Sequence, residues 1–229
     1  MTNANDSEFD ALIDDYFDAV LERNPHIATA LGVHKYDSEI PRGTAESVEE
    51  EIEEAKQLRA DIAEFDSPEA ELAVAALDYD IYEMDELRQW EANPQAIDAV
   101  ISFLYPLFAR DFASLGERLE LIADRLEKCP QYLEDTRERV TDPVEIWVEA
   151  ELASCGDLDG FFQLIADYAG KMERQDVAYR VNTAAEDTLD SVDEYEEWLE
   201  SLDTRSDWRI GGEAVDELLD KRFLQSGNE

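Results

Sequence analysis

The stretch that decides the fold is Ser7–Gly32, SEFDALIDDYFDAVLERNPHIATALG. Its apolar residues recur at i, i+3, i+4 and i+7, so they share one face of a helix: Phe9, Leu12, Ile13, Tyr16, Phe17, Val20 and Leu21. Ser7, with Asp10 three residues later, predicts the N-cap of this helix. Asn24-Pro25 is typical of a helix that ends and a short one that begins, and Gly32 closes the second helix.

The same periodicity continues through the rest of the chain. It predicts helices that begin at Thr44, Ser67, Ile97 (bent or ended by Pro106), Ser114, Pro130, Pro143, Gly156, Glu173, Val192 and Gly212. The helices from Glu173 and Val192 are expected to be separate, and Leu72, Trp147 and Ala150 are expected to face the core. Alternating β-patterns and hairpin turns are absent from the sequence.

These elements predict an all-α protein, an irregular multi-helix bundle of about ten helices joined by short loops. Loops this short leave no room for a flexible linker, so we expect a single domain over residues 1–229. The terminal residues 1–6 and 225–229 are expected to be disordered.

The composition is strongly acidic. Asp and Glu number 59 against 19 Lys and Arg, which gives a formal net charge of −40 on 229 residues. Such a charge repels itself in dilute buffer. In molar salt the Debye length falls to about 3 Å and the repulsion is screened. The chain is therefore expected to come from a halophile with a high-salt cytoplasm. Nucleic acids and anionic membrane surfaces are disfavoured as partners because no basic patch is present.

The sequence contains no membrane-spanning or signal segment and no cysteine motif. The most apolar stretch, Ala96–Ala109, is too short to span a bilayer. Residues 1–10 lack the basic and apolar regions of a signal peptide, so a cytoplasmic protein is expected. Cys129 and Cys155 have neither CxxC spacing nor a neighbouring histidine. We expect two buried, reduced thiols, with a structural disulfide as the alternative.

Familiar catalytic motifs are missing from the sequence. A zinc-peptidase helix needs two histidines four residues apart with a glutamate as base. His26 and His34 are the only histidines, they are eight residues apart, and Gly32 breaks the helix between them. No G-x-S-x-G nucleophile turn or glycine-rich phosphate loop occurs. The sequence therefore names no catalytic residue and no metal ligand, although a Ca²⁺ or Mg²⁺ site made of carboxylates alone stays open.

Two segments carry more polar and aromatic character than a core requires. The first is residues 25–37, where His34, Tyr36 and Asp37 follow the glycine that closes a helix. The second is residues 206–213, which hold Trp208 and Arg209. The simpler interpretation of the first segment is a set of local hydrogen bonds. The simpler interpretation of the second is that Trp208 packs on the next helix, beside an ion pair between Asp207 and Arg209. All five residues are also candidates for ligand contact.

The order of several short motifs resembles one known family. Residues 25–37 are followed by Pro41, then by Trp90…Asn93-Pro94, Arg125-Leu126…Pro130, Tyr195…Trp198-Leu199 and Trp208-Arg209-Ile210-Gly211. This ordered set, from about Phe9 to Phe223, is similar to the first half of the bacterial and archaeal "domain of unknown function 885" proteins. Those proteins are mostly helical and resemble gluzincin-type zinc carboxypeptidases.

The resemblance implies a helical domain that lacks the catalytic half of its longer relatives. Those relatives carry a His-Glu-x-x-His-like motif in their second half, and nothing in this chain matches its metal ligands. No catalytic residue and no metal ligand is therefore transferred, and zinc is implied only for the missing half. His34, Tyr36 and Asp37 are the positions at which the resemblance suggests contact with a ligand.

Three functions are consistent with these observations. The leading hypothesis is a noncatalytic domain that forms a cleft wall or a partner for a catalytic half. The second is a stand-alone interaction protein that binds a partner helix or another copy of itself. The third is an enzyme that works with carboxylates alone, which predicts a deep pocket with at least two buried acids of raised pKa.

Overall fold

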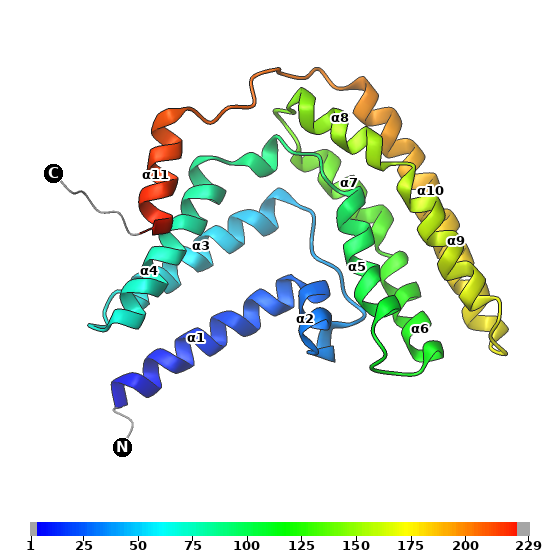
Figure 1. Cartoon of the computed structure of the whole chain (residues 1–229), viewed down its shortest axis with the longest axis horizontal. Helices are drawn as coiled ribbons and strands as arrows, with labels where there is room; N and C mark the ends of the chain where they lie inside the picture. Colours follow the sequence, from blue (N-terminus) through cyan, green and yellow to red (C-terminus); the bar gives the residue numbers. More distant parts are fainter. Residues whose placement is uncertain (1–3, 224–229) are drawn as a thin grey trace.

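The structure is a computed structural model that describes residues 4–223 (Figure 1). Its α-helices in chain order are α1 (Ala4–Arg23), α2 (Pro25–Leu31), α3 (Ala45–Ile62), α4 (Pro68–Ile81), α5 (Ile97–Ala109), α6 (Leu115–Leu126), α7 (Cys129–Arg139), α8 (Glu145–Ser154), α9 (Asp157–Ala169), α10 (Gln175–Ser201) and α11 (Gly212–Phe223). Shorter helical turns are η1 (His34–Tyr36), η2 (Tyr82–Glu86) and η3 (Gln89–Glu91). Within residues 4–223, extended backbone pairs only in one bridge, between Val144 and Arg205. The predicted all-α class is confirmed.

Most helix starts follow the local signals in the sequence. The hydroxyls of Thr44 and Ser67 accept hydrogen bonds from the backbone N–H groups three residues on, at the starts of α3 and α4. Ser114 and Glu117 form a complete capping box at α6. Gly32 ends α2 with φ of 86°, a left-handed conformation that glycine adopts without strain. These ends depend on neighbouring residues alone, which is why the sequence predicts them.

The helices pack as two groups, seen at the left and right of Figure 1. In the first group α1, α4 and α3 pack together and α11 covers α4. Its core holds Ala55, Leu58, Ile62, Ala70 and Leu77. In the second group the long helix α10 packs against α6, α7, α8 and α9, and α5 packs against α6, α8 and α9. The larger hydrophobic core lies in this second group.

Contacts between helices join the groups. Helix α2 packs against both α1 and α5, and α3 contacts α7. The loop before α3 lies so close to α7 that a Cβ on Gly43 would come within 3.0 Å of the Tyr132 carbonyl oxygen and of Asp135 Cβ. A residue without a side chain is therefore required where the loop meets α7.

The helix α10 differs from the prediction. The sequence predicts two helices, Glu173–Leu189 and Val192–Leu202, but a single helix runs from Gln175 to Ser201. Asp190 and Ser191 interrupt the apolar residues without breaking the helix, since neither blocks its hydrogen bonds. The buried positions Thr188, Val192, Tyr195 and Leu199 keep the three-to-four-residue spacing across that point.

Smaller corrections concern the first helix and three side chains. Helix α1 begins at Ala4, so Ser7 lies inside the helix and is not its N-cap. Disorder was predicted for residues 1–6, but residues 4–6 form the first turn of this helix. The prediction for residues 1–3 and 225–229 concerns positions outside the described residues. Leu72 and Ala150 are exposed and Trp147 is half-buried. In α8 the buried positions are Val148 and Glu151 because the helix turns a different face inward.

No helix within residues 4–223 is long and apolar enough to cross a membrane. The two thiols are unpaired and buried, as predicted. Each Sγ donates to the carbonyl four residues earlier, Cys129 to Arg125 and Cys155 to Glu151. Burial raises the pKa of both thiols to about 12, so they stay protonated at neutral pH.

Candidate functional site

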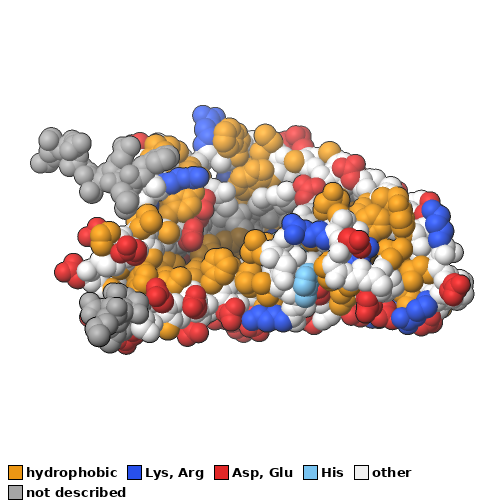
Figure 2. Space-filling view, turned by 60° about the horizontal axis from the view of Figure 1, so that its bottom comes forward, with side chains coloured by type: hydrophobic (Ala, Val, Ile, Leu, Met, Phe, Trp, Pro, Cys, Tyr) orange, Lys and Arg blue, Asp and Glu red, His pale blue; other side chains and the backbone are white. Residues whose placement is uncertain are grey.

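A cleft of about 1010 Å³ lies between the two groups of helices. Figure 2 shows a face of the molecule that is hollowed, with hydrophobic, acidic and basic side chains around the hollow. The cleft is built by the end of α1, the start of α2, the loop before α3, and parts of α3, α5 and α7. Its ionisable lining residues are Glu22, Arg23, His26, Tyr36, Glu39, Arg42, Glu50, Glu51, Glu54, Asp98, Tyr132 and Arg139.

Arg23 lies where α1 faces α3. Its Nη1 bonds the Glu54 carboxylate, and its Nε lies 3.6 Å from Glu51 Oε1, too far for a hydrogen bond. Nε and Nη2 of Arg23 are buried without a partner among the described residues. Burial raises the pKa of Glu51, while the Arg23 charge lowers it in part. The Glu51 side chain is 31% exposed, so it is partly buried.

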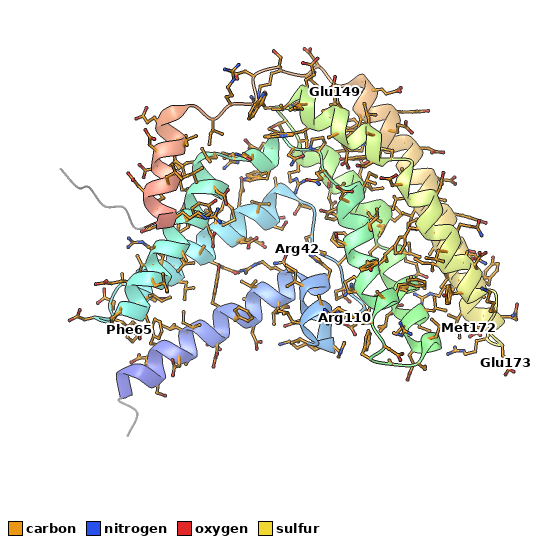
Figure 3. All side chains as sticks on the ribbon, in the orientation of Figure 1. Arg42, Phe65, Arg110, Glu149, Met172 and Glu173 are labelled. Carbon is orange, nitrogen blue, oxygen red and sulfur yellow. The ribbon has the colours of Figure 1, made fainter. Side chains whose placement is uncertain are left out.

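Arg42 supplies a second cation to this rim of the cleft. It bonds the carboxylate of Glu50, one turn into α3, and Figure 3 labels it beside the start of that helix. Glu39, in the same loop, accepts a hydrogen bond of 2.6 Å from Lys128. This bond lowers the pKa of Glu39. The acids on this rim are therefore neutralised by cations from their own surroundings.

His26 lies at the back of the cleft, against the ring of Phe103, with 5.3 Å between the ring centroids. Burial, followed by the nearby Arg125 charge, lowers the pKa of His26 to about 4. The imidazole is therefore neutral at neutral pH. Its Nδ1 is buried and has no hydrogen-bond partner among the residues of the described chain.

Arg139 lies in the last turn of α7, at the cleft wall that also contains Tyr132 and Gln95. Tyr132 is buried and packs edge-on against Phe103, with 4.9 Å between the ring centroids. The Nε of Arg139 is buried without an acceptor, and its guanidinium makes no ion pair within residues 4–223. The cleft lining therefore includes a cation that has no ion-pair partner among the described residues, together with aromatic and amide groups.

The first predicted segment forms a buried hydrogen-bond network. His34 Nδ1 lies 2.8 Å from Asp37 Oδ2, and Asp37 is only 4% exposed. Asp37 Oδ1 accepts a hydrogen bond of 2.6 Å from Thr29 Oγ1. The His34 ring stacks on Phe112 at 4.1 Å. The network supports the local hydrogen-bond interpretation of His34 and Asp37, and their contact with a ligand stays a prediction.

Arg125 completes this network from the neighbouring helix α6. Its side chain is fully buried, and it donates to Thr29 Oγ1 at 2.8 Å, to Pro25 O at 3.2 Å and to Phe103 O. Burial lowers the pKa of Arg125 to about 10, and the Asp37 carboxylate opposes that change. Arg125 therefore stays charged at neutral pH, and through Thr29 and the Asp37 carboxylate it links α2, α5 and α6 in one buried network.

The other predicted site residues fall in two different places. Tyr36 lines the large cleft, where its hydroxyl lies 3.4 Å from Glu22 Oε2. Trp208 and Arg209 line a separate cavity of about 250 Å³ together with Trp147. Trp208 is 54% exposed, and Arg209 pairs with Asp207 at 3.8 Å as the sequence suggests. The structure therefore does not bring the two predicted segments into one site.

The described residues do not fit the zinc ion that the resemblance implies for longer relatives. His34 is bonded to Asp37, and His26 is packed against Phe103. Within residues 4–223 no three His, Cys, Asp or Glu side chains are grouped as metal ligands. No chemical step of this chain is therefore assigned to a metal.

The fold and the cleft define a class: an all-helical protein with a mixed-charge cleft between two groups of helices. Residues 25–225 match the family described as "Bacterial protein of unknown function (DUF885)", and the chain belongs to that family. The family identified from the motifs is thereby confirmed.

One solved structure has a closely similar fold. It is described as "a putative lipoprotein of unknown function" from Shewanella oneidensis, with a TM-score of 0.78 and 16% sequence identity. The match covers 96% of this chain and 42% of that protein, so this chain spans less than half the length of its structural neighbour. At this identity the likeness establishes the fold alone. No curated protein shows a significant match.

No motif in the sequence places Arg23, His26 and Arg139 in one cleft. His26 lacks the spacing of a metal ligand, and neither arginine belongs to a motif. The sequence offers one signal for such a site, the low number of basic residues. With 19 Lys and Arg and 59 Asp and Glu, a cation without an acidic partner is expected to be uncommon. Finding which cation has no partner requires the tertiary structure.

Proposed function

We propose that this chain is a noncatalytic helical domain that forms one wall of a ligand cleft and packs against a second, catalytic half. The observation that carries the proposal is the extent of the structural match. Almost the whole of this chain corresponds to less than half of the Shewanella protein. A fold that accounts for part of a longer protein is expected to have a surface for the remainder.

An apolar face formed by α2, α5 and α9 is suited to that contact. We call it the α2–α5–α9 face, and its exposed members are Ile27, Leu31, Tyr105, Leu164 and Tyr168. Leu31 is 61% exposed and Tyr105 is 58% exposed. The three helices are neighbours, since α5 packs against both α2 and α9, and Phe108 contacts Tyr168 with 5.3 Å between the ring centroids. Exposed apolar surface of this kind marks a site of protein contact.

The test is direct binding in molar KCl between this purified chain and a polypeptide that carries the second half of the family pattern, with its histidine motif. We expect a one-to-one complex. Leu31→Glu and Tyr105→Glu should weaken it at least about tenfold, because each places a charge in an apolar interface. Leu72→Glu is the matched control, since Leu72 is 63% exposed on α4, away from this face. Equal affinity for all three variants would refute the assigned face.

Catalysis is tested on the chain alone. After dialysis in molar KCl we expect it to retain no stoichiometric zinc and to cleave no peptide. The complex with the second half is expected to do both. Stoichiometric zinc bound by this chain alone would overturn the noncatalytic proposal.

A second candidate function is self-association through the same face, which its exposed aromatic and aliphatic side chains also favour. Sedimentation of the chain alone in molar KCl distinguishes the two. A dimer that Tyr105→Glu dissociates would support self-association, whereas a monomer that binds the second half supports the leading proposal.

A further inference from the structure

Unpartnered buried nitrogens gather in the cleft. Within residues 4–223, six buried side-chain polar atoms lack a hydrogen-bond partner. Four of the six belong to residues that line the cleft: Arg23 Nε, Arg23 Nη2, His26 Nδ1 and Arg139 Nε. Folded proteins leave few buried polar groups unsatisfied, so a concentration of them in one cavity calls for an explanation. All four are nitrogens, and those of the two arginines are donors that require an acceptor.

The acids that line the cleft are already engaged. Two are bonded by neutral donors: Glu22 by Tyr36 and Asp98 by Gln95. Three others are bonded to cations: Glu54 to Arg23, Glu50 to Arg42, and Glu39 to Lys128. Glu51 lies 3.6 Å from Arg23 Nε, near its charge but without a hydrogen bond. Of the three arginines in the lining, Arg139 is the one that has no acidic partner among the described residues.

Arg139 shares the cleft with groups that can contact the rest of a ligand. Tyr132 and Phe103 supply apolar parts of the lining, and Gln95 supplies an amide. A guanidinium beside low-polarity walls attracts an oxyanion strongly, because its planar fork matches two acceptor oxygens. In molar salt this attraction acts only at contact distance, since charges farther apart than about 3 Å are screened.

The lining selects among anions. It contains six carboxylates and three arginines, so the cleft as a whole is negative. A phosphate dianion holds two charges on one group, so carboxylates in contact with it would repel it more strongly than a carboxylate group, which holds one charge. A volume of about 1010 Å³ also exceeds what a carboxylate group fills, so the cavity has room for the body of a larger molecule.

We propose that the cleft binds a carboxylate-bearing ligand whose carboxylate pairs with Arg139. The inference rests on the proposed role of the cleft as a ligand site and adds the chemical class of the ligand. The carboxylate can belong to a small organic acid or to the end of a peptide chain, and the test separates these sources.

The first test uses the unmodified protein in molar KCl and titration calorimetry. The probes are succinate, N-acetyl-trialanine, its C-terminal amide and inorganic phosphate. We expect N-acetyl-trialanine, succinate or both to bind. The amide should bind at least about tenfold more weakly than the acid, because a charge-assisted pair is lost. Succinate alone indicates a small acid, and the peptide acid alone indicates a chain end. Three results would overturn the proposal. The first is equal affinity for the peptide acid and its amide when succinate does not bind. The others are tighter binding of phosphate than of either acid, and no binding of either acid.

The second test identifies the residue. Arg139→Gln should lower the affinity for the bound acid at least about tenfold, and Arg139→Lys should retain part of it, because a point charge replaces the fork. Arg137→Gln is the matched control: it removes the same charge from the same helix, and Arg137 pairs with Glu134 outside the cleft. Affinities within about twofold for Arg139→Gln and Arg137→Gln would refute the role of Arg139.

The two proposals fail in different ways. Circular dichroism and thermal melting measure whether each variant is folded. If Arg139→Gln does not fold, the comparison of peptide acid and amide on the unmodified protein still tests the carboxylate proposal. Loss of that discrimination with docking of the second half intact removes only the ligand assignment. A chain that binds the acid and does not bind the second half removes only the docking proposal.

Discussion

At the scale of single residues, the buried charge pair explains why residues 25–37 carry so much polarity. Arg125 is fully buried, and Thr29 bridges it to Asp37. The Arg125 guanidinium also bonds Pro25 and Phe103, so one side chain satisfies backbone carbonyls from two helices. A buried charge pair stabilises a fold mainly through the cost of breaking it.

We expect Arg125→Met to lower the free energy of unfolding by about 3–5 kcal/mol, because the Asp37 carboxylate loses its buried cation. Urea denaturation in molar KCl measures the change. Adding Asp37→Asn to Arg125→Met should recover part of the loss, since it removes the unpaired charge. Arg137→Met, on the surface of α7, should change the stability by less than about 0.5 kcal/mol. A loss from Arg125→Met no larger than this control would contradict the role of the pair.

At the scale of elements, local signals placed most helix ends correctly. Helices were predicted to begin at Thr44, Ser67 and Ser114, and in the structure these residues are the N-caps of α3, α4 and α6; Gly32 ends α2 as predicted. The errors are informative. Ser7 resembles an N-cap but lies within α1, and α10 passes through the point where two helices were expected to meet. In both cases a favourable signal for an end did not end the helix, because the adjacent residues also support helix.

The capping box of α6 provides a prediction at this scale. Ser114→Ala should lower the free energy of unfolding by about 1 kcal/mol, because the N–H of Glu117 loses its acceptor at the helix start. Ser191→Ala is the control, since Ser191 is half-buried in the middle of α10, where alanine has the higher helix propensity. Its stability should be unchanged or slightly higher. Equal losses for both variants would show that the cap is not the cause.

At the scale of the whole molecule, the charge of −40 is the dominant feature. The ion pairs in the structure are mostly on the surface, as in Arg42–Glu50 and Arg174–Asp176, and such pairs contribute little in high salt. The unpaired acids repel one another, and this repulsion is what salt relieves. The halophilic origin proposed from the composition therefore has a measurable consequence.

We expect the melting temperature to rise steeply between low and molar KCl. Sucrose at matched osmolality is the control, because it is excluded from the protein surface without screening charge. A smaller rise in sucrose than in KCl indicates that screening is the main effect. A melting temperature that does not change with KCl would remove the inference of salt adaptation.

The helical class, most helix ends and the family follow from the sequence alone. These depend on residues within a turn or two of one another, or on an ordered set of short motifs. Only the tertiary structure decided the function of Asp37 in a buried pair, and the gathering of Arg23, His26 and Arg139 around one cleft. Contacts such as Arg125 to Pro25 join residues 100 positions apart. No local pattern encodes such pairings, because they depend on how the helices pack against one another.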